Sequence, residues 1–173
     1  MKITNHTATA DNVEKNFNMS YKQPSATMVT EEDEKGAWMD EDGVKYSKDG
    51  KKLLTCTNKG LSDYPIRQGT EVICDEAFVE CESLQSVVIP SSVTTLGDSA
   101  FFWCGALRSV TIPDSVTNIG DCAFLGCSSL QSIAIPDSVT SIGVLAFEYC
   151  SSLQSIIIPA SVTTLGDHTF EGC

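Results

Sequence analysis

The sequence predicts an α/β solenoid, a right-handed stack of coils in which each 23-residue unit supplies a strand, a turn and a short helix. The phrase IPDSVTNIGDCAFLGC at residues 112–127 returns, with few changes, as IPDSVTSIGVLAFEYC at residues 135–150, displaced by 23 positions. Such self-similarity at a fixed period is the mark of stacked repeats. Single residue types recur at the same step in columns: Pro90, Pro113, Pro136 and Pro159; Leu84, Leu107, Leu130 and Leu153; Phe78, Phe101, Phe124, Phe147 and Phe170; Cys81, Cys104, Cys127, Cys150 and Cys173.

The first element of each unit is a strand. In residues 84–89 leucine, valine and isoleucine alternate with other residues, the period of two that is typical of a half-buried strand. Pro90 ends this strand because proline has no N–H to donate to a ladder. The equivalent segments of the following units should lie beside it.

The last element of each unit is predicted to be a short helix. The spacing of Leu96, Ala100, Cys104 and Leu107 is close to helical, so residues 97–104 are expected to form about two turns. Aspartates follow the glycine at the start of this segment in most units, where a carboxylate can accept backbone N–H bonds as an N-cap. The acidic column comprises Asp98, Asp121 and Asp167.

The chain is predicted to have three parts. Residues 1–36 have no period and are expected to be a flexible tail, which holds glycosylation sequons at Asn5 and Asn18. Residues 37–66 are expected to form a β-hairpin cap around the turn at Asp49-Gly50. Residues 67–173 are expected to form a leucine-rich repeat array, since the 23-residue period lies in the range of 20–29 typical of such repeats, with the last unit truncated and a two-residue insertion before Pro90. The edge at Cys173 is then uncapped, and self-association through it is one expectation.

These motifs resemble a known family. The pattern IPxSVTxIGxxAFxxCxxLxxIxI, as it stands in residues 112–135, is similar to BspA-type leucine-rich repeats, known from bacterial surface and secreted proteins and some protozoan surface proteins. The segment DGVKYSKDGKKLLTCTNKGLSDYPI looks like the hairpin that this family often places before its coils. The resemblance covers roughly residues 44–173 and implies adhesion to, or recognition of, another protein. It also suggests the cell surface, although the start MKITNHTATADN lacks an apolar signal core, so the compartment stays open.

Composition argues against some partners. Residues 61–173 carry thirteen acidic side chains and two basic ones, Arg67 and Arg108, whereas a nucleic-acid surface needs clustered Lys and Arg. The longest apolar runs fall far short of the roughly 20 residues that span a bilayer. We therefore expect neither a nucleic-acid partner nor a transmembrane segment.

Motifs that suggest chemistry have simpler structural interpretations. The five column cysteines face inward and read as a ladder of reduced thiols, with disulfides or a metal as less favoured alternatives, while Cys122 is expected to be exposed. An EF-hand at residues 40–51 fails because Val44 and Lys51 occupy ligand positions. The two histidines, His6 and His168, give no convincing base for a nucleophile. No enzyme activity, cofactor or metal is expected.

What remains is surface recognition. The outward strand positions form a smooth, nearly uncharged concave strip suited to a protein segment or a glycan, and aromatic residues at variable positions are favoured interface anchors. The alternative is a structural spacer that displays other domains and has no ligand, in which case the small residues merely suit a tight curve. The candidate partner-binding residues are Ser86, Val88, Arg108, Ser109, Thr111, Ser132, Ala134, Ser155, Ile157, Trp103 and Tyr149.

Overall fold

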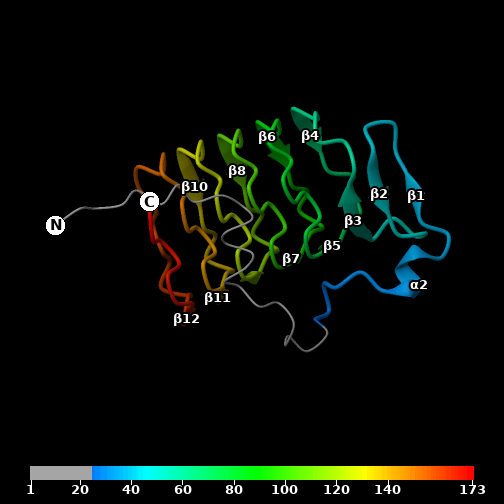
Figure 1. Ribbon diagram of the computed structural model, residues 1–173. Coiled ribbons are helices and arrows are strands. Elements are labelled where there is room, and N and C mark those ends of the chain that lie inside the picture. Colours follow the sequence, from blue (N-terminus) through cyan, green and yellow to red (C-terminus); the bar gives the residue numbers. More distant parts are fainter. Residues whose placement is uncertain (1–24) are drawn as a thin grey trace.

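The computed structural model describes residues 25–173, which form a stack of coils running from an N-terminal cap to the C-terminus (Figure 1). Across residues 25–173 the secondary structure consists of short strands and one single-turn helix. The elements are α2 (Glu31–Glu34), β1 (Trp38–Met39), β2 (Val44–Tyr46), β3 (Lys52–Cys56), β4 (Asp63–Pro65), β5 (Val72–Ile73), β6 (Ser86–Val88), β7 (Thr95–Leu96), β8 (Ser109–Thr111), β9 (Asn118–Ile119), β10 (Ser132–Ala134), β11 (Ser141–Ile142) and β12 (Thr164–Leu165).

Within these residues the strands form two sheets on opposite sides of the stack (Figure 1). The four-stranded sheet has the order β10-β8-β6-β4, and all its pairs are parallel. The other sheet has the order β1-β2-β3-β5-β7-β9-β11-β12, and it is parallel from β3 onward. Neighbouring coils are in register at a step of 23 residues, as Ser86, Ser109 and Ser132 illustrate. The predicted solenoid is confirmed.

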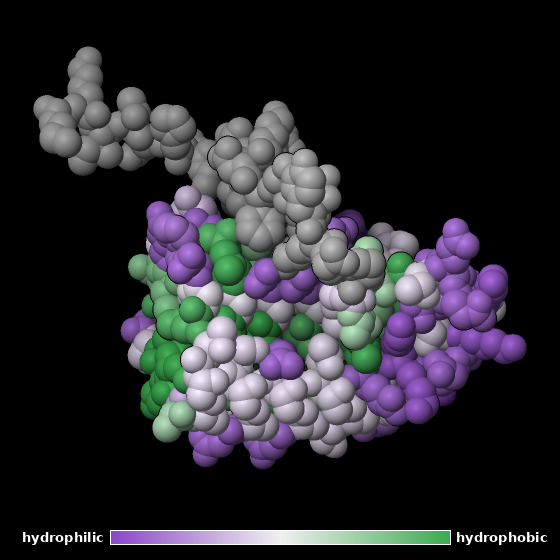
Figure 2. All heavy atoms as spheres, turned by 90° about the horizontal axis from the view of Figure 1, so that it is seen from below, coloured by the Kyte–Doolittle hydropathy of each residue, from purple (hydrophilic) through white to green (hydrophobic). Residues whose placement is uncertain are grey.

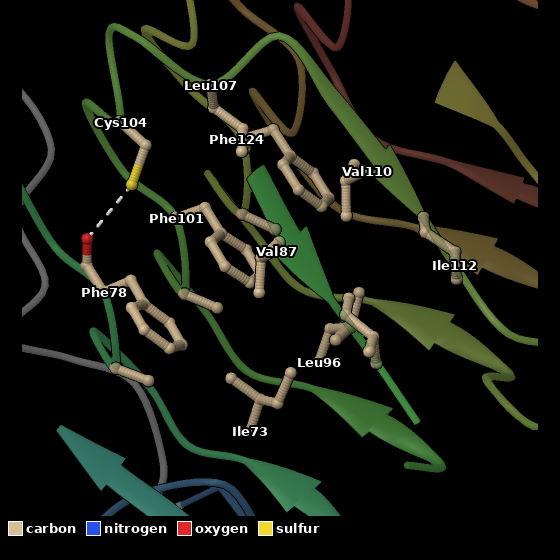
Figure 3. Close-up of a cluster of buried hydrophobic side chains, with 14 of the residues drawn as sticks. Ile73, Phe78, Val87, Leu96, Phe101, Cys104, Leu107, Val110, Ile112 and Phe124 are labelled. Atoms are coloured by element: carbon tan, nitrogen blue, oxygen red, sulfur yellow. Dashed lines mark hydrogen bonds between the residues drawn. The ribbon is translucent and has the colours of Figure 1, made fainter. Parts of the chain in front are cut away.

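The core lies between the two sheets and is built from the predicted columns. Phe78, Phe101 and Phe124 are fully buried and stack nearly parallel, with ring centroids 5.2 and 5.3 Å apart (Figure 3). Since each coil places the same residues at the same height, every side chain in a column packs against its copy one coil away. Burial of one unit therefore depends on the presence of its neighbours.

The predicted short helix is wrong, because residues 97–104 form consecutive turns. Their N–H groups alternate between two kinds of partner. Phe102 bonds to Ser99 within the coil, whereas Phe101 donates to the carbonyl of Ala123 in the next coil, at 2.8 Å. Ser99 and Trp103 have φ of 55° and 54°, a left-handed conformation that interrupts any helix. The apolar side chains are about four residues apart because each coil has two left-handed residues, and not because the chain winds as a helix.

The cap is a three-stranded antiparallel meander, since β2 pairs with β1 and with β3. Trp38 stacks on Tyr46 at 5.0 Å, and the Arg67 guanidinium lies 5.2 Å from the Trp38 ring centre. The Tyr46 hydroxyl is 2.7 Å from that of Tyr64, which in turn donates to Asp40. Burial raises the pKa of both tyrosines, so both remain protonated donors at neutral pH. These contacts join the cap to the first coil.

The expected two-residue insertion is also wrong. Pro65 pairs with Val88, 23 residues away, and Val72 pairs with Thr95 at the same step. Pro65 is therefore the counterpart of Val88, and the apparent displacement came from aligning two prolines that occupy different positions in their coils. The four-stranded sheet begins with β4, inside the range that we assigned to the cap.

The last part of the expected tail contacts the solenoid. Helix α2 has a capping box, in which Thr30 and Asp33 bond each other's backbone N–H, and Asp33 pairs with Lys52 at 2.9 Å. The carbonyl of Thr27 accepts the N–H of Asp75 at 3.1 Å. Residues 25–36 are thus tied to the first coil, whereas the sequons at Asn5 and Asn18 lie outside the described residues.

Candidate functional site

The first candidate site is the outer face of the four-stranded sheet, which we call the strip. Alternation in each strand turns the central residue inward and its neighbours outward, and parallel pairing aligns the outward residues in two rows across the coils. Val88 is 61% exposed and Ile157 82% exposed, far more than a core residue. The rows are Ser86, Ser109, Ser132 and Ser155, and Val88, Thr111, Ala134 and Ile157.

The strip is almost free of charge along its length. Arg108 lies exposed just before β8, and Asp63 stands at the cap end, where it accepts hydrogen bonds from the Ser86 hydroxyl at 2.5 Å and the Ser62 hydroxyl at 2.7 Å. These hydroxyl donors lower the pKa of Asp63, so it stays ionised at neutral pH. A partner would therefore meet small hydroxyl and aliphatic groups, with an anion at one end.

The other side of the molecule has a different character. Figure 2, which views the stack from below, shows weakly polar residues along the coils, hydrophilic residues gathered at the cap end and hydrophobic residues at the C-terminal end. Leu165, in β12, is 51% exposed at that end. The threonines that directly precede strands of the eight-stranded sheet bond along the stack, as Thr140 Oγ1 does to the Thr117 carbonyl at 3.3 Å.

Two of the predicted site residues lie away from the strip. Trp103 and Tyr149 occupy left-handed positions in the turns, with φ of 54° and 56°, and border a second apolar cluster of Phe102, Cys122 and Leu125. A Cβ on Gly126 would come within 2.9 Å of the Trp103 ring, and one on Gly172 within 2.6 Å of the Tyr149 ring. Each aromatic ring therefore rests on a glycine of the next coil. The alternation Trp103, Gly126, Tyr149, Gly172 at a 23-residue step was the sequence signal for this packing.

The aspartates of the acidic column accept backbone N–H bonds, as predicted, but the donors are not those that an N-cap would use. Asp98 Oδ1 accepts the N–H of Asp121 at 2.8 Å, and Asp121 Oδ1 accepts that of Val144 at the same distance. These carboxylates thus bond to the next coil and not to a helix of their own. Among residues 25–173, no group of three or more His, Cys, Asp or Glu side chains is placed to hold a metal ion.

The residues of the remaining motifs form contacts with their close neighbours in the sequence. Asp40, at the start of the EF-hand-like stretch, accepts the N–H of Asp42 at 3.1 Å and of Val44 at 2.8 Å. These bonds are those of the turn between β1 and β2. His168 lies exposed and its Nδ1 is 2.6 Å from Glu171.

The column cysteines are thiols that bond to the preceding coil. Cys104 Sγ donates to the carbonyl of Phe78 at 3.2 Å (Figure 3). Cys127 Sγ likewise donates to the carbonyl of Phe101 at 3.3 Å. Burial raises the pKa of Cys104 to about 12. The expected exposure of Cys122 is wrong, since it is 2% exposed, because its turn places it in the second apolar cluster.

The comparisons with known proteins agree with this geometry. The family described as "BspA type Leucine rich repeat region" matches residues 55–173 in six copies. Among curated proteins, no relative matches the chain with significance. Among solved structures, a leucine-rich repeat protein from Bacteroides ovatus is 34% identical, with a TM-score of 0.63 over 77% of this chain and 36% of its own.

Two further solved structures are similar. A leucine rich cell surface protein from Faecalibacterium prausnitzii is 32% identical, with a TM-score of 0.68 over 79% of this chain and 35% of its own. The T. pallidum Leucine Rich Repeat protein is 27% identical, with a TM-score of 0.68 over 88% of this chain and 68% of its own. The chain thus spans about a third of the length of the first two structures. In residues 25–173, no helix has both the length and the apolar character that crossing a membrane requires.

Proposed function

The chain belongs to the BspA-type leucine-rich repeat family, and on that premise we propose that it is a non-catalytic binding module that takes a protein ligand on the strip. One observation carries this proposal: aligned outward residues of successive coils give a continuous surface with exposed aliphatic side chains, above all Val88 and Ile157. Burying such side chains in a complex is favourable, and the nearly uncharged surface carries little cost of desolvation.

The family context supports an adhesive or recognition role at the cell surface. Its repeat proteins are generally protein-interaction or surface proteins, and the relative from Faecalibacterium prausnitzii is described as a cell surface protein. The serine row of the strip supplies hydroxyl groups that can donate and accept hydrogen bonds, which suits an extended protein segment laid along the stack. Trp103 and Tyr149 are left out of the proposed site because they pack on the next coil.

The test is a charge placed in the middle of the strip. Thr111→Glu buries an unpaired carboxylate under any ligand on this face, so affinity should fall by about tenfold or more. Thr117→Glu is the matched control, because Thr117 is equally exposed but lies beside the other sheet. Binding of the variants to arrays of purified surface proteins, matrix proteins and glycans, followed by interferometry on the hits, gives the dissociation constants.

The outcomes separate the candidate functions. A protein ligand weakened by Thr111→Glu and not by Thr117→Glu supports the proposal. Equal weakening by both variants contradicts the assignment of the site, and ligands that are all glycans contradict the ligand class. If nothing binds, the chain is the spacer that displays other domains. Circular dichroism of both variants establishes that they are folded.

A further inference from the structure

The thiol column begins differently from the way it continues. Cys104, Cys127 and Cys150 each donate S–H to a phenylalanine carbonyl one coil earlier, at 3.2–3.3 Å. Cys81 is the first member, and the segment before it is strand β3 of the cap instead of a coil with a phenylalanine turn. Cys56, at the end of β3, lies in the same buried cluster, and interaction between the two thiols shifts the pKa of each. At this junction, therefore, the column places sulfur against sulfur.

The two cysteines are held together by the backbone around them. The Cys56 N–H donates to the carbonyl of Ala77 at 2.6 Å, which fixes the end of β3 against the first coil. Cys56 Sγ is also 3.5 Å from the carbonyl of Asn58. Both cysteines are buried, whereas residues 57–60, which directly follow Cys56, are exposed, so this loop is where a small molecule would enter.

A cation lies next to the pair. Lys59 Nζ is 4.0 Å from Cys81 Sγ and donates to the carbonyl of Val79. The hydrogen bond from Cys81, aided by Lys59, lowers the pKa of Cys56 to about 7. The pKa of Cys81 is raised, because it donates that bond and is buried. The pair thus has an ionisable sulfur beside a protonated one, whereas burial raises the pKa of Cys104 and Cys150 to about 12.

We propose that Cys56 and Cys81 are a modification site at which a hydroperoxide forms an intramolecular disulfide between the cap and the first coil. The Cys56 thiolate attacks the peroxide, the O–O bond breaks, and the sulfur becomes a sulfenic acid as hydroxide leaves. The Cys81 sulfur then displaces the sulfenic oxygen, which departs as water with the Cys81 proton. Two thiols are oxidised and one peroxide is reduced, with the Lys59 ammonium placed to stabilise negative charge on Cys81 as it attacks.

The disulfide would lock the two parts that the tyrosine contacts already join. It links the last residue of β3 to the turn of the first coil, so the cap can no longer separate from the stack. The site is independent of the strip, because neither sulfur belongs to the outer face of the four-stranded sheet.

The experiment is limited oxidation of the full chain with hydrogen peroxide near neutral pH. Samples are quenched with a thiol-alkylating reagent in denaturant, and intact mass and non-reducing peptide maps follow each cysteine. We expect loss of two hydrogen atoms and a Cys56–Cys81 peptide pair, about tenfold faster than loss of any other thiol, since the thiolate is the reactive form. Oxidation of other cysteines at the same rate, or Cys56 converted to sulfinic acid without a disulfide, would overturn the proposal.

Variants keep the test decisive. Cys56→Ser should abolish the fast reaction, and Cys104→Ser, the matched change one coil further along the column, should leave it intact. Lys59→Met changes an exposed side chain and should slow disulfide formation several-fold while the fold is kept. An unchanged rate in Lys59→Met, or a fast reaction that survives in Cys56→Ser, contradicts the assigned roles.

Discussion

At the scale of single residues, a column of glycines sets how closely the coils approach. A Cβ on Gly120 would lie 2.6 Å from the backbone of Gly97, and one on Gly97 would lie 2.6 Å from that of Asp75. No side chain fits at such a distance without moving a coil. Cys74 stands in this column without difficulty because its neighbour is the cap strand β3, where its side chain is fully buried.

The first prediction is that Gly120→Ala destabilises the protein by about 2–3 kcal/mol, because the new methyl group must push two coils apart. Gly105→Ala is the matched control. Its nearest atom is Ser128 Oγ at 3.8 Å, and its effect should stay within about 0.5 kcal/mol. Urea unfolding followed by circular dichroism measures both, and equal stabilities would contradict the proposed tight approach.

At the scale of elements, consecutive turns take the place of the helix that the sequence predicted at residues 97–104. The N–H groups of this segment reach the next coil, as Phe101 to Ala123, while its thiols reach the preceding coil, as Cys104 to Phe78. The buried thiol column is therefore part of the bonding between coils. It must stay protonated, because a thiolate could not donate to a carbonyl and would be costly to bury.

The second prediction is loss of stability at alkaline pH. The pKa values of Cys104 and Cys150 are raised to about 12 in the folded chain, whereas an unfolded cysteine titrates near pH 8.5. The stability that these thiols contribute is therefore complete below about pH 8.5 and is lost as the pH rises toward 12.

At about pH 10 the loss should be roughly 2 kcal/mol per buried thiol. Urea unfolding under reducing conditions at neutral and alkaline pH measures this difference. Cys127→Ala removes one such thiol, whose pKa burial also raises, so the variant should lose less stability between the two pH values. An identical pH dependence in the variant would rule out the thiol column as the cause.

At the scale of the whole molecule, the coils form a one-dimensional array. From β4 to β12, pairing between coils joins only strands one coil apart, at a constant step of 23 residues, whereas β3 of the cap pairs with β5 at a step of 20. In such an array stability is approximately the sum of the units and their nearest-neighbour interfaces. The length of the stack can therefore change without a change in the geometry of the remaining coils.

The third prediction concerns the removal of one complete coil. Deleting residues 113–135 joins Ile112 to Pro136, the same dipeptide as in the intact chain, so every column keeps its register. The shortened chain should fold cooperatively, with a denaturant m-value lower by roughly a seventh because less surface is exposed on unfolding. Deleting residues 113–134 is the control. This change shifts all later columns by one position, and folding of both deletions alike would contradict the array.

Much of the architecture could be predicted because the same residue pattern recurs in several repeats. The inward strand residues, the phenylalanine column and the cysteine column are all buried as expected through Cys150. The short helix could not be excluded, because apolar spacing does not report φ and the left-handed residues include Ser99, Trp103 and Leu145 instead of glycine alone. The strip residues were identified because they occupy the outward positions of the alternating strand pattern. Their part in binding stays a prediction.

The sequence by itself determined the period, the inward and outward faces of the strands and the distribution of charge, because each depends only on residue type and spacing along the chain. Only the tertiary structure decided which segments meet. It tied residues 25–36 to the first coil, rested Trp103 on Gly126, and placed Cys56 against Cys81 beneath Lys59. These contacts join residues whose separations do not follow a local periodicity, or whose geometry depends on backbone angles, so they arise only when the cap and coils are packed together.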